Sequence, residues 1–157
     1  MRKIILSVSI LLSFTSLLKA QESSATKVFE YRPAPGQFIN LLPAYANGDN
    51  EQTICNKCLE AFKTTQLVSL GGFGGYIIVG FDHSIINVPG EYDFKIDANA
   101  MDGPYGISSE PGIVLVSVDS NRNGLPDDEW YELKGSEYNN PQCIKNYTVT
   151  YLSLIHI

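Results

Sequence analysis

Beyond Leu67, apolar residues recur at every second position and Gly, Pro and Asn punctuate the chain, which constrains the fold more than any other feature. The runs 76–81 and 113–118 are apolar on both faces, as in strands of a covered sheet. Three other short runs are also expected to be strands: 92–97, 130–133 and 147–151. Short strands joined by turns predict a mostly β protein, namely a β-sandwich or jelly roll.

One short helix is expected before these strands. Residues 21–48 form an extended lead-in, because prolines at 33, 35 and 43 and a glycine at 36 oppose regular structure. Asp49 or Asn50 can then cap a helix over 51–64. The apolar residues of its predicted inner face have helical spacing: Ile54, Cys58, Leu59 and Phe62. The β-sandwich domain is thus expected to span 49–151.

The first 20 residues have the pattern of a secretory signal peptide. Arg2 and Lys3 precede 15 uncharged residues, and Ala20 offers a small residue for cleavage. The apolar run is shorter than the roughly 20 residues that cross a bilayer as a helix, and the polar segment 21–24 follows at once. We therefore expect an exported protein, in the periplasm, at the cell surface or outside the cell, with no membrane span after cleavage.

The mature chain is expected to be acidic. Cleavage after residue 20 leaves eight Lys and Arg against 17 Asp and Glu, a formal charge of −9. A negative net charge argues against nucleic acid and anionic membranes as partners, and it favours binding of a divalent cation.

The three cysteines, Cys55, Cys58 and Cys143, are an odd number for an exported protein. Cys55 and Cys58 have the spacing of a redox pair, but no thioredoxin-like strand-to-helix unit surrounds them. Cys58 is expected to pack as a small apolar residue. A disulfide from either residue to Cys143 is left open by the sequence.

The last six residues, 152–157, do not continue the preceding pattern and resemble a non-native tail. The native chain is therefore expected to continue past Tyr151, and the sandwich to be truncated at its C-terminal end.

The segment 119–129 has the strongest chemical pattern in the chain, DSNRNGLPDDE. Oxygen side chains at its first, third, fifth and ninth positions surround a glycine at the sixth, as a loop around Ca²⁺ requires. Trp130 stands where an EF-hand has its bidentate glutamate, so Asp128 or Glu129 must close the site. The alternative is an Asn-Gly turn with a solvated acidic face. The predicted ligands are Asp119, Asn121, Asn123, the Leu125 carbonyl, Asp127, and Asp128 or Glu129.

The remaining motifs predict neither a phosphate-binding loop nor a catalytic triad. The run 71–75, GGFGG, precedes a strand and matches no phosphate loop, so a close approach of backbones or a bulge is expected. Consecutive Asp82, His83 and Ser84 cannot form a triad among themselves, and His83 is expected to be a polar residue at a strand end. A pair of carboxylates for glycoside hydrolysis is an alternative, since four acidic residues lie at strand ends or in loops: Asp93, Asp97, Asp102 and Glu110.

Five phrases between residues 28 and 151 form a distinctive set: YRPAPGQFIN at 31–40, SLGGFGGY at 69–76, GFDH at 80–83, SEPGIV at 109–114 and GLPDDEWYEL at 124–133. Together they resemble a family of PKD-domain-containing cell-surface proteins of Gram-negative gut bacteria. The pattern GFD, YDF and EP is also similar to secreted galactose-binding-like jelly rolls. Residues 98–109 are expected to be a loop, and the chain departs from the family at its start, where Ala98 and Met101 replace the first and last positions of Gly-Asn-Ala-Phe.

The resemblance implies an extracellular binding protein, in some cases serving uptake of glycans or corrinoids. The sequence therefore predicts an exported, calcium-stabilised surface module, not an enzyme, that binds a carbohydrate or another small molecule, with an outer-membrane uptake system as a further partner. The alternatives are a secreted hydrolase with paired carboxylates and a structural or adhesive surface module.

Overall fold

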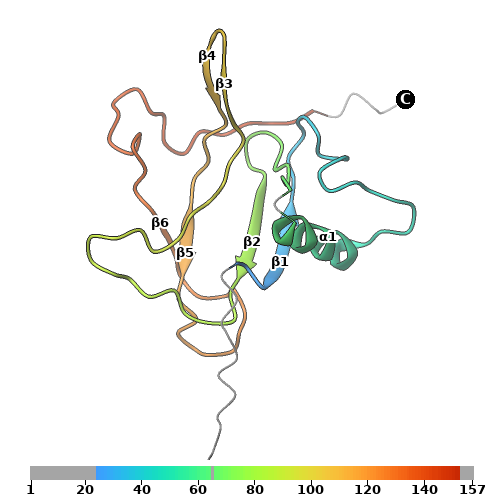
Figure 1. Cartoon of the computed structure of the whole chain (residues 1–157), viewed down its shortest axis with the longest axis vertical. Coiled ribbons are helices and arrows are strands. Elements are labelled where there is room, and N and C mark those ends of the chain that lie inside the picture. Colours follow the sequence, from blue (N-terminus) through green and yellow to red (C-terminus); the bar gives the residue numbers. More distant parts are fainter. Residues whose placement is uncertain (1–23, 65, 153–157) are drawn as a thin grey trace, which may run out of the picture.

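The computed structural model describes residues 24–64 and 66–152 (Figure 1). The expected signal peptide, 1–20, and all but the first residue of the expected tail lie outside these ranges. Within these ranges, three antiparallel pairs of short strands and one helix make up the regular structure, which confirms the mostly β prediction. In chain order the elements are β1 (Lys27–Arg32), α1 (Glu51–Lys63), β2 (Tyr76–Gly80), β3 (Ala100–Gly103), β4 (Gly106–Ser109), β5 (Leu115–Ser117) and β6 (Trp130–Glu132).

The predicted lead-in contains a strand, so the expectation of an irregular 21–48 was wrong for its first part. β1 pairs antiparallel with β2, with Tyr31 opposite Ile77 and a register shift between Val28 and Glu30. The prolines that suggested irregularity begin only after Arg32, where the strand ends. The remainder of the lead-in, through Gly48, consists of turns, bends and an isolated bridge.

Helix α1 begins as predicted and ends one residue early. Asn50 is the N-cap: its side chain accepts from the Thr53 N–H, and the Thr53 hydroxyl accepts from the Asn50 N–H, forming a capping box. Asp49, the alternative cap, instead binds Lys57 and the Ala46 N–H. Thr64 is the C-cap residue.

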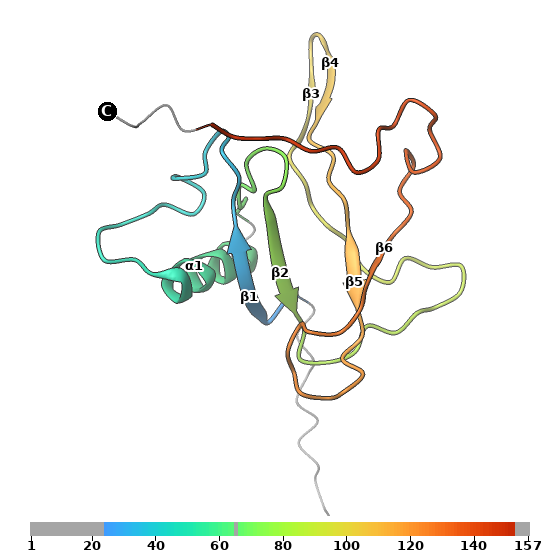
Figure 2. The ribbon, with the colours of Figure 1, turned by 180° about the vertical axis from the view of Figure 1, so that it is seen from behind.

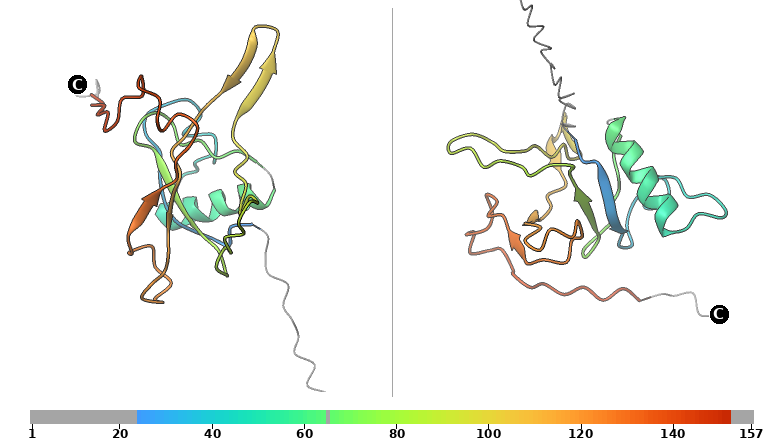
Figure 3. Two further views of the ribbon diagram at one scale, coloured as in Figure 1. Left: turned by 90° about the vertical axis from the view of Figure 1, so that its left-hand side faces the viewer. Right: turned by 90° about the horizontal axis from the view of Figure 1, so that it is seen from below.

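The inner face of α1 differs in part from the predicted one. Ile54 and Cys58 are buried as expected, whereas Leu59 and Phe62 are only half-buried. Cys55 and Ala61 are buried in their place. The stripe that faces β1 is therefore centred on small side chains, because the helix lies directly against the strand, as seen in Figure 3.

A small core joins α1 to the β1–β2 pair. Its buried members are Tyr31, Ile54, Cys55 and Cys58, with Val28, Val68 and Ile77 packed around them. Tyr31 is 7% exposed and donates from its hydroxyl to the Ser69 carbonyl at 2.6 Å. This bond fixes the segment that leads from the helix into β2.

The glycine-rich run before β2 is a site of close backbone approach, as predicted. A Cβ on Gly71 would overlap the Ala34 carbonyl, and Gly71 also has a φ of +74°. The Gly72 N–H donates to the Pro35 carbonyl, and Tyr151 donates from its hydroxyl to the Phe73 carbonyl. The lead-in, this loop and the C-terminal segment therefore meet at one place.

Two predicted strands are absent from the structure. Residues 92–97 and 147–151 alternate in polarity, but neither run has a hydrogen-bonded partner strand. Alternation alone does not make a strand, because the backbone groups also need a neighbour. The segment 98–109, expected as a loop, instead holds the β3–β4 hairpin, which projects from the body of the molecule (Figure 2).

The three strand pairs remain separate sheets of two strands each, so the sandwich stays a prediction. The β5–β6 pair lies on the side of β2 away from β1 and α1 (Figures 1 and 2). Strands expected to be covered on both faces expose apolar side chains, as Ile113 at 74% and Val118 at 70% show. No helix within 24–64 or 66–152 is both long and apolar enough to span a membrane.

Candidate functional site

The predicted calcium loop, 119–129, connects β5 to β6. The two strands pair with Ser117 opposite Trp130, so the loop starts and ends at neighbouring backbone positions. β5 and β6 are shorter than the predicted 113–118 and 130–133, although the Leu133 N–H still donates to the Val114 carbonyl. The strand pair thus fixes both ends of the loop.

Asp119 organises the first half of the loop. Its Oδ1 accepts from the Asn123 N–H at 3.0 Å, and its Oδ2 accepts from the Gly124 N–H at 2.9 Å. Gly124 has a φ of +74° and Arg122 one of +59°, so the chain turns back through two left-handed positions. The predicted sharp turn at the glycine is confirmed, whereas nothing in the type of residue 122 signals its conformation.

The two asparagines and Asp127 form the centre of the loop. The Oδ1 atoms of Asn121 and Asn123 accept from the backbone N–H groups of Asn123 and Leu125 at 2.9 and 2.7 Å. Their side-chain amides donate to Asp127, from Asn121 at 3.2 Å and from Asn123 at 2.9 Å. These side-chain hydrogen bonds from Asn123 and Asn121 lower the pKa of the Asp127 carboxyl. Asp119, Asn121, Asn123 and Asp127 therefore belong to one network.

The two candidates for the closing carboxylate differ in their surroundings. Glu129 accepts from the Tyr131 hydroxyl at 2.6 Å, a bond that raises the pKa of Tyr131. Asp128 is half-buried, and its Oδ2 is buried without a hydrogen-bond partner. A buried carboxylate oxygen without a donor is unfavourable unless a cation or another group reaches it. Asp128 is therefore the better candidate, a distinction that spacing alone did not make.

The donor set of the loop fits a hard cation, since every predicted ligand atom is an oxygen. Nevertheless, no three acidic, histidine or cysteine side chains converge into a metal cluster within the part of the chain that the structure describes. Asp127 faces the amide N–H groups of Asn121 and Asn123. Calcium binding thus requires these N–H groups to turn away, so that the ion replaces them at the Asp127 carboxylate.

Cys55 and Cys58 lie in α1, and all three cysteines of the chain are free. No disulfide to Cys143 is formed; Cys143 is exposed, whereas Cys55 and Cys58 are buried. Cys58 has no exposed surface, which confirms the prediction that it packs as a small apolar residue. Burial raises the pKa of Cys58 to about 12, and also raises that of Cys55. These pKa shifts oppose formation of the thiolate that redox exchange requires.

The other predicted polar positions are dispersed. His83 follows β2, and its Nδ1 lies 2.6 Å from Oδ1 of Asp82. Asp93 accepts from the Val88 N–H, in a turn where the Glu91 N–H also donates to the Val88 carbonyl. Asp97 pairs with Lys95 on the exposed surface. Asp102 lies in β3, and Glu110 follows β4.

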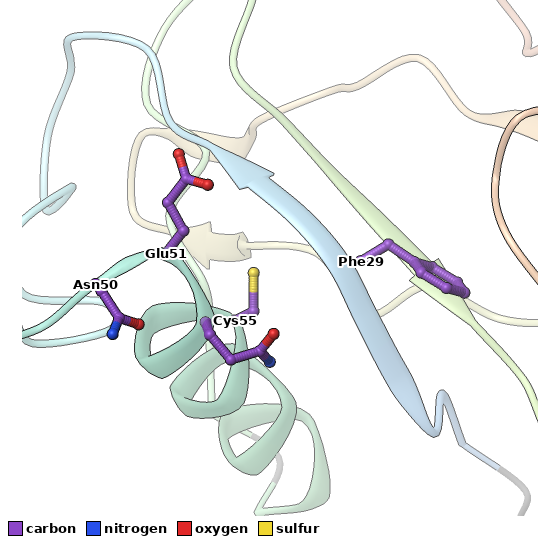
Figure 4. A pocket seen from close by; sticks show the side chains of 5 residues that line it. Phe29, Asn50, Glu51 and Cys55 are labelled. Atoms are coloured by element: carbon purple, nitrogen blue, oxygen red, sulfur yellow. The ribbon is translucent and has the colours of Figure 1, made fainter.

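An open depression of about 420 Å³ lies between β1 and the first turns of α1 (Figure 4). Phe29, Asn50, Glu51, Gln52 and Cys55 line it, and it contains none of the carboxylates proposed for hydrolysis. Arg32 joins its rim through ion pairs to Glu30 and Glu51 at 2.8 and 2.6 Å. The sequence did not indicate this depression, because it depends on the unexpected strand β1.

Comparison with known proteins provides no further assignment: no protein-family model matches the chain, and no curated protein matches it significantly.

Proposed function

We propose that the chain is an exported, calcium-stabilised surface module that binds a small molecule or carbohydrate, with one Ca²⁺ in the loop 119–129. The observation that carries the calcium assignment is the network around Asp119 and Asp127, together with the unpartnered Oδ2 of Asp128. Within this proposal the strand pairs belong to a sandwich or jelly roll, and the protein is related to PKD-domain-containing surface proteins.

The proposed role of the ion is structural. Four carboxylates lie within 119–129, and their mutual repulsion opposes a compact loop. The hydrogen bonds to Asp119 and Asp127 offset part of this repulsion through partial charges alone. A divalent cation would neutralise two of the four charges and supply the missing partner of Asp128. It would thereby stabilise the connection between β5 and β6 without taking part in a reaction.

The ligand-binding part of the proposal rests on exposed aromatic side chains. Tyr92 and Tyr105 are fully exposed, the latter between β3 and β4 at the end of the projecting hairpin. A tyrosine ring offers an apolar face and a polar hydroxyl, which suits contact with a sugar. We expect Tyr105→Ala to weaken glycan binding, measured with soluble oligosaccharides. Tyr138→Ala is the control and should leave glycan binding unchanged, because the Nζ atom of Lys145 lies over that ring, 3.4 Å from its centre, where a sugar would otherwise stack.

Terbium luminescence tests the calcium assignment directly. Trp130, the single tryptophan of the chain, follows the loop at once and can transfer excitation energy to a Tb³⁺ ion bound there. We expect Tb³⁺ emission on excitation of Trp130, and its loss when Ca²⁺ is added. Mg²⁺ should compete poorly, because it demands a smaller octahedral site.

Two variants make this experiment specific. Asp119→Ala should abolish sensitised emission, whereas Asp97→Ala removes an exposed carboxylate outside the loop and should leave emission unchanged. Equal emission from the two variants would show that the ion binds elsewhere. For the export part of the proposal, the intact mass of the secreted protein should correspond to a chain that starts at Gln21; a retained Met1 would contradict it.

A further inference from the structure

Two Asn-Gly pairs in the chain, Asn47-Gly48 and Asn123-Gly124, are open to spontaneous deamidation. In this reaction the glycine backbone nitrogen attacks Cγ of the asparagine, because no Cβ blocks its approach. The bond from Cγ to the side-chain nitrogen breaks, and ammonia leaves with the backbone proton. Water then opens the resulting succinimide to aspartate or isoaspartate. The rate depends on whether the side chain and the glycine N–H are free to meet.

Asn47-Gly48 is unrestrained. Both residues are exposed, and within the described part of the chain neither the Asn47 side chain nor the Gly48 N–H forms a hydrogen bond. The pair lies in a turn that its neighbours hold, through the bonds from the Asp49 N–H to the Ala46 carbonyl and from the Ala46 N–H to the Asp49 carboxylate. Gly48 has open space around its Cα.

At Asn123-Gly124, hydrogen bonds hold both the attacking glycine N–H and the asparagine side chain. The Gly124 N–H donates to Asp119, and the adjacent carboxylate also disfavours the amide anion that must form for attack. The Asn123 Oδ1 accepts from the Leu125 N–H, and its Nδ2 donates to both oxygens of Asp127. Rotation of this amide toward Gly124 would break these bonds.

We infer that Asn47 is the principal deamidation site of the protein and that the hydrogen bonds of the loop 119–129 protect Asn123. The hydrogen bonds that must break before attack imply a rate at Asn123 at least tenfold below that at Asn47. This inference concerns the hydrogen bonds of the ion-free loop, so it is tested with chelator present and does not depend on the calcium proposal.

Modification at Asn47 has a structural consequence. Aspartate adds a negative charge two residues from Asp49, which pairs with Lys57 at 2.6 Å. Isoaspartate lengthens the backbone three residues before the Asn50 capping box. Molecules that carry either product should therefore differ from unmodified protein at the start of α1.

Peptide mapping by mass spectrometry of the full chain, aged in mildly alkaline buffer, tests the inference. We expect the mass increase of deamidation to accumulate in the peptide with Asn47, and at least tenfold more slowly in the peptide with Asn123. In concentrated urea the two rates should converge. Equal rates in the folded protein, or a faster rate at Asn123, would overturn the inference.

Three variants separate protection from intrinsic reactivity. Asp119→Asn removes the charged acceptor of the Gly124 N–H and should raise the rate at Asn123 without changing that at Asn47. Asn47→Gln and Gly48→Ala should each suppress modification at the first site alone. If Asp119→Asn leaves Asn123 unchanged in folded protein, the loop hydrogen bonds are not the cause of protection. Repeating the experiment with chelator should preserve the order of the rates even if the calcium proposal fails.

Discussion

Replacement of Asp119 by alanine should destabilise the protein in two separable ways. The first does not involve calcium. The substitution removes the acceptor of two backbone N–H groups, those of Asn123 and Gly124. At a net 0.5–1.5 kcal/mol for each bond, the loss in unfolding free energy is about 1–3 kcal/mol. The melting temperature should therefore fall by several degrees even in the presence of a chelator.

The second effect appears only with calcium. Extracellular calcium modules have dissociation constants on the order of 10⁻⁴ to 10⁻³ M. At ten times this constant, binding to the folded state alone adds about 1.4 kcal/mol to the wild-type unfolding free energy. Asp119→Ala should show no such increment, so the gap between wild type and variant should widen by about 1.4 kcal/mol on going from chelator to calcium.

Denaturant unfolding in both conditions measures the two effects, and thermal melts serve as a second probe. Asp97→Ala is the matched control: its carboxylate pairs with Lys95 at an exposed position, where an ion pair contributes little. The control should keep the full calcium increment. Equal stability of the wild type with calcium and with chelator would refute the calcium argument, whereas an unchanged Asp119→Ala variant in chelator would refute the hydrogen-bond argument.

Three further outcomes are expected. Gly71→Ala should destabilise the protein by more than about 2 kcal/mol in denaturant unfolding, since its Cβ would overlap backbone and its φ is positive, whereas Gly112→Ala, with open space around it, should stay within about 1 kcal/mol of wild type. Iodoacetamide should label the exposed Cys143 promptly and Cys58 only after unfolding; prompt labelling of Cys58 would contradict its burial. The pKa values of Cys58 and Tyr31 are both raised to about 12, from 9.0 and 10.0. Because both groups lose their protons at lower pH in the unfolded protein than in the folded one, their stabilising contribution is complete below pH 9, and the unfolding free energy should decline as the pH rises from 9 toward 12. Tyr31→Phe should reduce the decline above pH 10.

Features set by local chemistry could be predicted from the sequence. The Asn50 cap, the Gly124 turn and the close approach at Gly71 each depend on a few neighbouring residues or on the absence of a side chain. The spacing of the oxygen-bearing side chains predicted that Asp119, Asn121, Asn123 and Asp127 would converge in one loop, but not the hydrogen bonds from the two asparagine amides to Asp127. The choice between Asp128 and Glu129 did not, because it depends on the contact between Glu129 and Tyr131 and on the burial of Asp128.

Features set by long-range pairing could not be predicted. β1 was missed because the prolines that follow it suggested irregular structure, and because its partner β2 lies more than 40 residues away. The same limitation explains the false strands at 92–97 and 147–151. Their side chains alternate correctly, but hydrogen bonding to a neighbour decides whether a segment becomes a strand. The hairpin at 100–109 was taken for a loop because its apolar residues, such as Ile107, are few and exposed.

Calcium at the proposed site would contribute more to the stability of the β5–β6 pair than it would to that of strands in a large sheet. β5 and β6 pair over three residues each and belong to a sheet of two strands, which is marginally stable alone in water. Every residue of β6 is exposed, so burial of apolar surface contributes little to holding it in place. The loop is the covalent connection between these strands, and its closure depends on contacts to Asp119 and Asp127. An ion that favours the closed loop by about 1.4 kcal/mol would raise the closed population about tenfold. The β5–β6 pairing should therefore respond to calcium more strongly than the α1–β1 core, and hydrogen exchange at the Tyr131 and Leu133 amides, compared with exchange in α1, would reveal that difference.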